Sequence, residues 1–233
     1  MPNWTSNDVT IVCKSAEQAR EIAALVMSAD NEFDFDRIIP MPETLDIEES
    51  GKTRLDLAFY CKSKGLQNPS RYSAEVDEDF KPDLENGRIA YENIKKYGAM
   101  TWYDWSCRNW GTKWNSHGAS TTFGDDVVGN KVYSRFDTAW SCPLPVLVRL
   151  SEKFPDAEIV LDCDYEGGMA SDRYIFKHGA IVFSGEYAMR IVDCDDDSIT
   201  YPSWDNVPDD RYATEVRDAQ DTPWWNTAFG GER

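Results

Sequence analysis

The sequence is poor in the residue types that most often carry catalysis or bind nucleic acid. It has only 2 histidines in 233 residues, and its 24 lysines and arginines stand against 42 aspartates and glutamates, giving a formal net charge of -18. Affinity for phosphate backbones comes from clustered Lys and Arg, so this charge argues against direct nucleic-acid binding and against an anionic membrane surface. It favours a basic protein partner instead.

Long apolar runs and closely paired cysteines are also missing. The start of the chain is polar without a basic segment, and the apolar run at residues 22–27 is far too short to span a bilayer. We therefore expect no secretory signal and a cytoplasmic location. The six cysteines include no Cys-x-x-Cys pair, which argues against a zinc ribbon or finger, and we expect free thiols and no metal or other cofactor.

The pattern that is present is that of a folded α+β domain. The apolar fraction of 41% and the aromatic fraction of 13% are typical of a packed core. Residues 9–13 predict a strand, residues 16–29 an amphipathic helix capped by Ser15, and residues 33–39 a second strand. A helical insertion is expected at about 43–130, followed by a strand, a helix and further strands. This order predicts a ferredoxin-like sandwich, with helices on one side of an antiparallel sheet.

The predicted domains are a ferredoxin-like domain with its insertion at residues 1–192 and an acidic, tryptophan-containing extension at 193–233. Between residues 193 and 223 the extension holds ten acidic residues and two basic ones. Carboxylates crowded in this way repel one another, and a cationic partner would relieve that repulsion. The acidic residues predicted to bind a partner in the extension are Asp193, Asp195, Asp196, Asp197, Asp209 and Asp210.

Three further carboxylates, Asp162, Asp164 and Glu166, alternate along a predicted strand and therefore share one face. Consecutive members lie about 6.6 Å apart in an extended chain, which is wide for a shared set of metal ligands. The alternation is typical of a solvated strand face, and it also suits a row of charges that imitates spaced phosphates. We include all three in the predicted acidic binding surface and predict no metal site.

Tryptophans and polar residues gather within residues 102–115. An aromatic set beside cations can stack a base and reach its phosphate, whereas aromatics at helical spacing more often belong to a core. Both interpretations are open from the sequence. The candidate ligand-binding residues are Trp102, Arg108, Trp110, Lys113, Trp114 and Asn115.

Several phrases resemble the YubB-type ferredoxin-like family of phage and conjugative-plasmid proteins. They include FDFDRIIPMP at residues 33–42, NWGTKWN at 109–115 and FDTAWSCPLP at 136–145, and the resemblance covers roughly residues 1–185. It implies a ferredoxin-like fold and a mobile-element origin. It implies no activity and assigns no catalytic residue.

Together these features predict a non-enzymatic accessory protein of a phage or another mobile element. It would bind and inhibit a host defence protein with a basic, nucleic-acid-binding surface, such as a CRISPR-type or restriction complex, by acidic mimicry of nucleic acid. The first alternative is a small-ligand or nucleotide-binding module that uses the tryptophan-rich segment. The second is a metal-dependent enzyme that uses the carboxylates of the strand.

Overall fold

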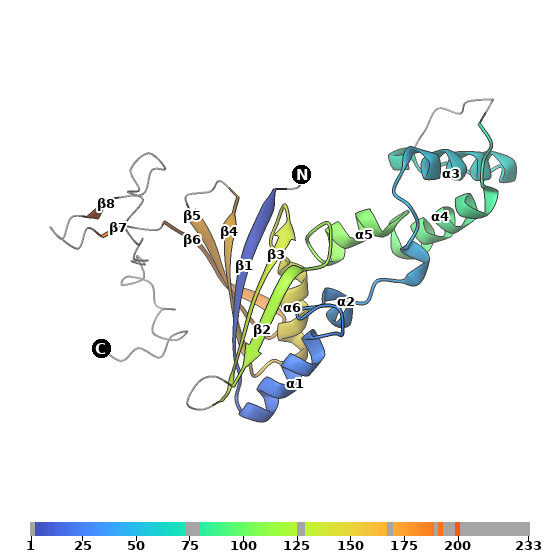
Figure 1. Ribbon diagram of the computed structural model, residues 1–233. Coiled ribbons are helices and arrows are strands. Elements are labelled where there is room, and N and C mark those ends of the chain that lie inside the picture. The colour runs from blue at the N-terminus through green and yellow to red at the C-terminus, as the bar shows by residue number, and fades with distance from the viewer. Residues whose placement is uncertain are drawn as a thin grey trace.

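The computed structural model describes residues 3–72, 80–124, 129–166, 170–188, 191–192 and 199–200. Six strands form one antiparallel sheet in the order β2-β3-β1-β4-β5-β6, and helices cover one of its faces (Figure 1). The strands are β1 (Trp4–Val12), β2 (His117–Phe123), β3 (Lys131–Ala139), β4 (Glu158–Tyr165), β5 (Ala170–Lys177), β6 (Ala180–Ala188), β7 (Ile191–Val192) and β8 (Ile199–Thr200). The helices are α1 (Ala16–Val26), α2 (Phe35–Ile38), α3 (Gly51–Lys64), α4 (Leu84–Tyr97), α5 (Trp102–Asn109) and α6 (Leu144–Lys153), with single turns η1 (Glu43–Leu45) and η2 (Ser70–Tyr72).

The topology confirms the predicted ferredoxin-like α+β fold. Leaving the insertion aside, the chain runs β1-α1-β2-β3-α6-β4, and these four strands lie in the order β2-β3-β1-β4 with every neighbouring pair antiparallel. This is the arrangement of a β-α-β-β-α-β unit. The β5–β6 hairpin extends the sheet beyond β4.

The core lies between the sheet and the helices α1 and α6. Strand β1 alternates buried and half-buried residues, so Val9 and Ile11 point toward the helices. Helix α1 begins at Ser15, whose hydroxyl accepts a hydrogen bond from the Gln18 amide as the sequence predicts. Fully burying a side chain such as Ile22 of α1 stabilises the fold by about 1.5–3 kcal/mol.

Two predicted elements are corrected by the structure. The strand predicted at residues 33–39 is wrong, because the chain there forms α2, capped by the Asp34 carboxylate with Phe35 and Ile38 buried. Strand β2 forms inside the predicted insertion range of 43–130 and pairs with β3 at the edge of the sheet. The insertion therefore precedes the second strand of the fold.

The cysteines also differ from the expectation of free thiols. Cys142, just before α6, and Cys163 in β4 form a disulfide across a Cα–Cα distance of 6.5 Å. Cys13 is buried, Cys61 is free and buried, and Cys107 is free and exposed. The disulfide therefore ties the start of α6 to the centre of the sheet.

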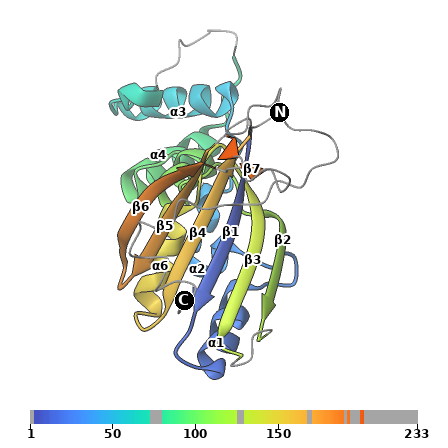
Figure 2. The same ribbon diagram turned by 90° about the vertical axis from the view of Figure 1, so that its left-hand side faces the viewer.

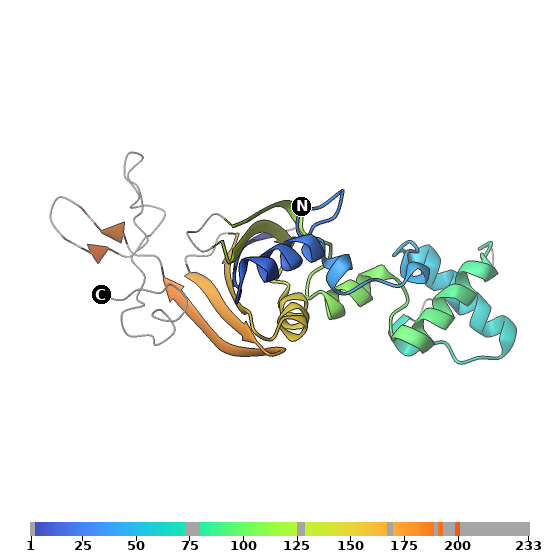
Figure 3. The same cartoon turned by 90° about the horizontal axis from the view of Figure 1, so that it is seen from below.

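The helical insertion packs as a small unit of its own. Helices α3 and α4 lie side by side beyond α5, away from α1 and α6 (Figures 1 and 3). They share a small core whose buried members are Leu57, Cys61, Tyr72, Ala90 and Met100.

No described helix covers the other face of the sheet, which Figure 2 shows toward the viewer. None of the helices in the described part of the chain is long and apolar enough to cross a membrane.

Candidate functional site: an aromatic and acidic surface at one end of the sheet

Aromatic side chains from distant parts of the sequence gather where β1 begins and β3 ends. Trp4 opens β1 in register with Ala139, and Trp140 follows β3 directly. The loop between α5 and β2 brings further aromatic and cationic groups to the same place. We call this set the aromatic platform; its members are Trp4, Tyr103, Lys113, Trp114, His117 and Trp140.

The lysine ammonium lies among three rings of the platform. The Lys113 Nζ atom is 4.4 Å from the ring centroid of Trp114, 5.0 Å from that of Trp140 and 5.7 Å from that of Tyr103. All three distances lie within the range of a cation–π interaction. The indoles remain accessible, since Trp114 is 38% exposed and Trp140 is 45% exposed.

The platform continues onto the face of the sheet that no described helix covers. The Trp4 ring lies 6.2 Å from that of Trp114 and stacks on His117 at 5.2 Å, measured between centroids. Three tryptophans, a tyrosine, a histidine and a lysine thus form one contiguous surface.

Trp140 has an unusual backbone for a large side chain. Its φ is +76°, in the left-handed region that costs an L-residue about 1–2 kcal/mol. The Trp140 amide donates to the Asn3 carbonyl over 2.9 Å, which fixes the turn to the start of the chain. Because the indole is nearly half exposed, burial of this side chain does not account for the strain.

Hydrogen bonds join the two loops that carry the platform. The Thr112 hydroxyl donates to the Ala139 carbonyl over 2.8 Å, and the Ser141 hydroxyl donates to the Gly111 carbonyl over 2.6 Å. Gly111 has a φ of +82°, and a Cβ there would lie 2.7 Å from the Pro145 Cδ, so only glycine fits. The loops are therefore held in one arrangement, and the rings they carry are preorganised.

Carboxylates lie beside the platform on the same face of the sheet, the one that no described helix covers. Asp137 of β3 and Asp164 of β4 lie in register with Ser6 of β1 from opposite sides, two residues along from Trp4. With strands about 4.8 Å apart, their backbones are separated by about 10 Å. The Glu166 carboxylate accepts a hydrogen bond from the Trp4 amide over 2.9 Å. We call Asp137, Asp164 and Glu166 the acidic flank.

The three carboxylates predicted to share one strand face have different environments in the structure. Asp164 and Glu166 lie in the acidic flank, whereas Asp162 accepts two hydrogen bonds from the guanidinium of Arg173, a side chain only 1% exposed. The Asp162 carboxylate therefore neutralises the buried Arg173 of the neighbouring strand. Among the residues that the structure describes, no group of three His, Cys, Asp or Glu side chains is placed to hold a metal ion.

The ligand-binding residues predicted within 102–115 also lie in different environments, some in the platform and others in the core. Lys113 and Trp114 lie in the platform, whereas Trp110 is 6% exposed and donates from its indole to the Ile39 carbonyl over 3.0 Å. Asn115 accepts from the Phe35 amide over 2.8 Å and donates to Asp34 over 2.7 Å, which holds α2 in place.

The remaining two candidates lie around the helix α5. Trp102 begins α5 half-buried, with its ring edge-on to that of Tyr103 at 5.8 Å. Arg108 donates to the carbonyls of Tyr97 and Gly98 and thereby caps the C-terminal end of α4.

Sequence reasoning missed four members of the platform: Trp4, Tyr103, His117 and Trp140. Trp140 carried a usable signal, since a tryptophan between a strand and the Pro143 that opens α6 sits in a turn, where exposure is common. Trp4 and His117 join the site only through strand pairing, which the sequence does not display.

The predicted acidic residues of the extension (Asp193, Asp195, Asp196, Asp197, Asp209 and Asp210) lie outside the described residues.

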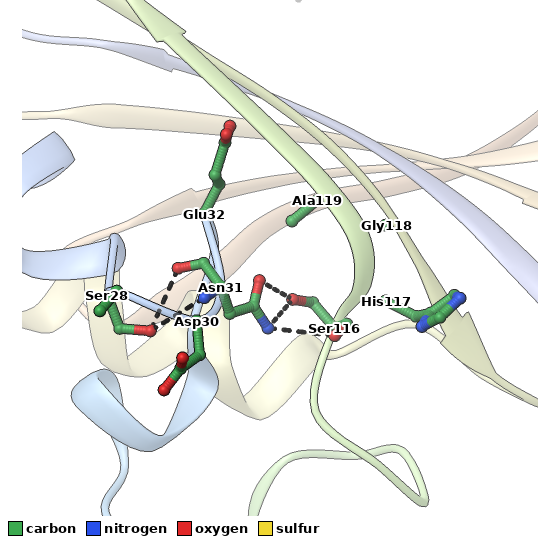
Figure 4. Close-up of a pocket in the computed structure, with 9 residues that line it drawn as sticks. Ser28, Asp30, Asn31, Glu32, Ser116, His117, Gly118 and Ala119 are labelled. Atoms are coloured by element: carbon green, nitrogen blue, oxygen red, sulfur yellow. Dashed lines mark hydrogen bonds between the residues drawn. The ribbon is translucent and has the colours of Figure 1, made fainter.

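A polar pocket of about 390 Å³ lies between the α1–α2 loop and the start of β2 (Figure 4). Its polar groups hold these two segments together: the Ser116 hydroxyl bonds Asn31 and the Phe33 carbonyl, and the Glu32 carboxylate accepts from the Thr121 amide. His117 points away from the Asn31–Ser116 pair. The polar groups of this pocket therefore connect the α1–α2 loop to β2.

One family model agrees with the ferredoxin-like fold. Residues 109–201 match a family model described as a ferredoxin-like domain in Api92-like protein. A crystal structure of the protein api92 from Yersinia pseudotuberculosis is similar with 12% sequence identity and a TM-score of 0.43, covering 81% of this chain and 99% of that chain. No curated protein matches the chain. The match covers less than half of the chain and supports a ferredoxin-like domain; it does not test the resemblance to the YubB-type family.

Proposed function

We propose that the chain is a non-enzymatic binding protein that docks a basic partner protein on the aromatic platform and the acidic flank. The observation that carries the proposal is the turn at Trp140, where a strained backbone presents an exposed indole beside a second one, Trp114. Strain of this kind persists where the surrounding structure enforces it, and it concentrates at binding and catalytic sites.

The chemistry of the surface suits a protein partner. Tryptophan and tyrosine are enriched among the residues that dominate binding energy at protein interfaces, because they bury large areas at little cost in conformational entropy. The acidic flank and the net charge of -18 complement a basic partner and would accelerate its association. The two features therefore favour the same class of partner.

More specifically, we propose that the partner is a host defence protein. The chain would act in the host cytoplasm as an accessory protein of a phage or plasmid, occupying the basic surface that a host defence protein uses for DNA or RNA. The support for this form is the overall charge, the acidic composition of residues 193–233 and the resemblance of the sequence to mobile-element proteins.

The proposal is tested by capturing partners from a bacterial lysate on the immobilised full chain. The comparison is with a double variant, Trp114→Ala with Trp140→Ala, and with Leu84→Ala, which removes a 47% exposed side chain from α4 in the insertion. We expect a stoichiometric protein that the wild type and Leu84→Ala retain and the double variant loses. Retention of the same proteins by the double variant would contradict docking on the platform.

The mimicry form has its own test with the captured partner. Its binding should weaken sharply with salt, should compete with duplex DNA or RNA, and should weaken when Asp195, Asp196 and Asp197 are changed to Asn. Affinity that is insensitive to all three changes would rule out mimicry while leaving the protein interface in place.

A nucleotide ligand is the second candidate, and the placement of Lys113 between the rings of Trp114 and Trp140 favours it. A base could stack on either indole while the ammonium reaches a phosphate. A thermal-shift series with mononucleotides separates the two candidates, because only this one requires a rise in Tm with a small anion. We do not propose a metal-dependent enzyme, because the Asp162 carboxylate that it would use is paired with Arg173.

A further inference from the structure

The three rings around the Lys113 ammonium form an aromatic cage. Trp114, Trp140 and Tyr103 come from different segments, and their centroids lie 4.4–5.7 Å from the Nζ atom. Such cages are the sites at which proteins recognise substituted ammonium groups, because several ring faces present negative potential to one cation. In this chain the cation is the protein's own lysine.

The cage is rigid while its occupant is flexible. The loops are joined by the hydrogen bonds of Thr112 and Ser141, and the Lys113 carbonyl accepts from the Ser106 hydroxyl over 2.7 Å, which fixes the lysine backbone. The four-carbon stem of a lysine has free rotamers, and the Lys113 side chain is only half-buried. The ammonium can therefore leave the cage while the rings stay in place.

Carboxylates lie beside Trp4, whose ring is 6.2 Å from that of Trp114 in the cage, and they favour a cationic ligand. Asp137 and Asp164 stand on the same sheet face as Trp4, and Glu166 is hydrogen-bonded to the Trp4 amide. An anion approaching the rings would meet these carboxylates, whereas a cation would be attracted by them. A preformed cage beside carboxylates is matched to an ammonium or guanidinium group.

We infer that the cage is a receptor for a cationic side chain of the partner, and that Lys113 is an internal plug that this side chain displaces. The inference rests on the proposed function for where the partner docks, and it adds the chemistry of the group that enters. It makes Lys113 a competitor of the ligand, so removing its charge strengthens binding. A nucleotide site predicts that removing the Lys113 charge weakens binding, because Lys113 would then hold the phosphate.

The change in affinity on removing the Lys113 charge is measured by fluorine NMR on the full chain labelled with 5-fluorotryptophan. The probe is the trimethyllysine amide, titrated at constant ionic strength, with its uncharged tert-butyl isostere as the control ligand. The variants are Lys113→Met, which keeps the apolar stem, and Lys113→Met combined with Trp140→Ala. Unchanged resonances of the buried Trp105 and Trp110 show that each variant is folded.

The expected result is that Lys113→Met binds the cationic probe about tenfold more tightly than the wild type, with shifts at Trp114 and Trp140. Binding should be lost in the variant that also lacks Trp140, and the isostere should not bind. Equal or weaker binding by Lys113→Met would overturn the inference.

The outcome is separable from that of the proposed function. If the double variant Trp114→Ala with Trp140→Ala loses the captured partner but Lys113→Met gains no affinity for the probe, the interface stands and the cage fails. If the probe binds the cage but the captured proteins do not depend on these tryptophans, the cage stands and the proposed function fails.

Discussion

Trp140 is the residue at which backbone strain and side-chain exposure coincide, with a φ of +76° and an indole that is 45% exposed. If the strain serves presentation of the ring, glycine should fit the backbone better than alanine. We expect Trp140→Gly to be about 1 kcal/mol more stable than Trp140→Ala, because only glycine adopts this φ without cost. Urea denaturation measures the difference. An alanine variant as stable as the glycine variant would show that the turn is not strained.

The ion pair of Asp162 and Arg173 is a second contact whose contribution to stability can be measured separately. Arg173 is 1% exposed, so its charge depends on partners inside the protein. Changing Asp162→Asn removes a bidentate carboxylate from a buried guanidinium and should cost about 3–5 kcal/mol in the free energy of unfolding.

The matched control is Asp156→Asn, which breaks the exposed pair of Asp156 with Lys14 and should leave the urea midpoint unchanged. Equal effects at the two positions would mean that the Asp162 pair is solvated and remains available to a ligand.

At the scale of elements, the contact between α3 and α4 depends on one glycine. A Cβ at Gly87 would lie 2.2 Å from the Asp56 carbonyl oxygen and 2.8 Å from the Tyr60 Cβ. Helix propensity alone predicts that Gly87→Ala stabilises by about 1 kcal/mol, whereas the clash with backbone atoms costs about 1–3 kcal/mol. We expect the clash to win and thermal stability to fall.

Gly51→Ala is the comparison for that variant. Gly51 begins α3 with nothing within 4 Å of its added Cβ, so this change should be neutral or stabilising. A stabilised Gly87→Ala variant would mean that the two helices are not in close contact.

The same helix pair should weaken in acid. The Asp56 side chain is fully buried and accepts hydrogen bonds from Lys52, Asn86 and the Asp83 amide. Burial raises the pKa of Asp56, but the hydrogen bonds outweigh it and hold the pKa below the ordinary 3.8. A carboxyl whose pKa is lowered by folding stabilises the protein above its unfolded pKa, and this stabilisation is lost as the pH falls through the folded value.

Urea unfolding at pH 7, 4.5 and 3 tests this dependence. The wild type should be more stable than Asp56→Asn at pH 7, and the gap should narrow below pH 3.8. A gap that is independent of pH would show that the carboxylate charge is not involved.

The elements also show which parts of the fold the sequence can reveal. Helix α1 was predictable because its cap at Ser15 and its apolar spacing are local. Helix α2 was misread as a strand because Phe33 and Phe35 alternate with aspartates, although both rings are buried. Strand β2 was missed because it is a polar edge strand in which only Thr121 is fully buried.

For the whole molecule, the site depends on pairings that no local pattern records. Trp4 and Trp140 meet because β1 and β3 are neighbours in the sheet, and Lys113 joins them through a loop that follows the insertion. The sequence leaves open whether residues 102–115 belong to the core or to a ligand site, and the structure divides them, since Trp110 is buried whereas Lys113 and Trp114 reach the surface. It could not predict the cage, whose three rings come from three segments.

The arrangement also gives the molecule two distinct ends. The platform lies at the end of the sheet where β1 starts, whereas Val182, 57% exposed in β6, lies at the opposite end and the opposite edge. We therefore expect the partner to contact the platform end and not the region around Val182.

Site-specific photo-crosslinking in bacterial cells tests this directly. The chain carries p-benzoylphenylalanine in place of either Trp140 or Val182, and the adducts formed under light are compared. We expect a discrete adduct with a basic protein from position 140 and none from position 182. Equal adducts from both positions, or an adduct from position 182 alone, would contradict it.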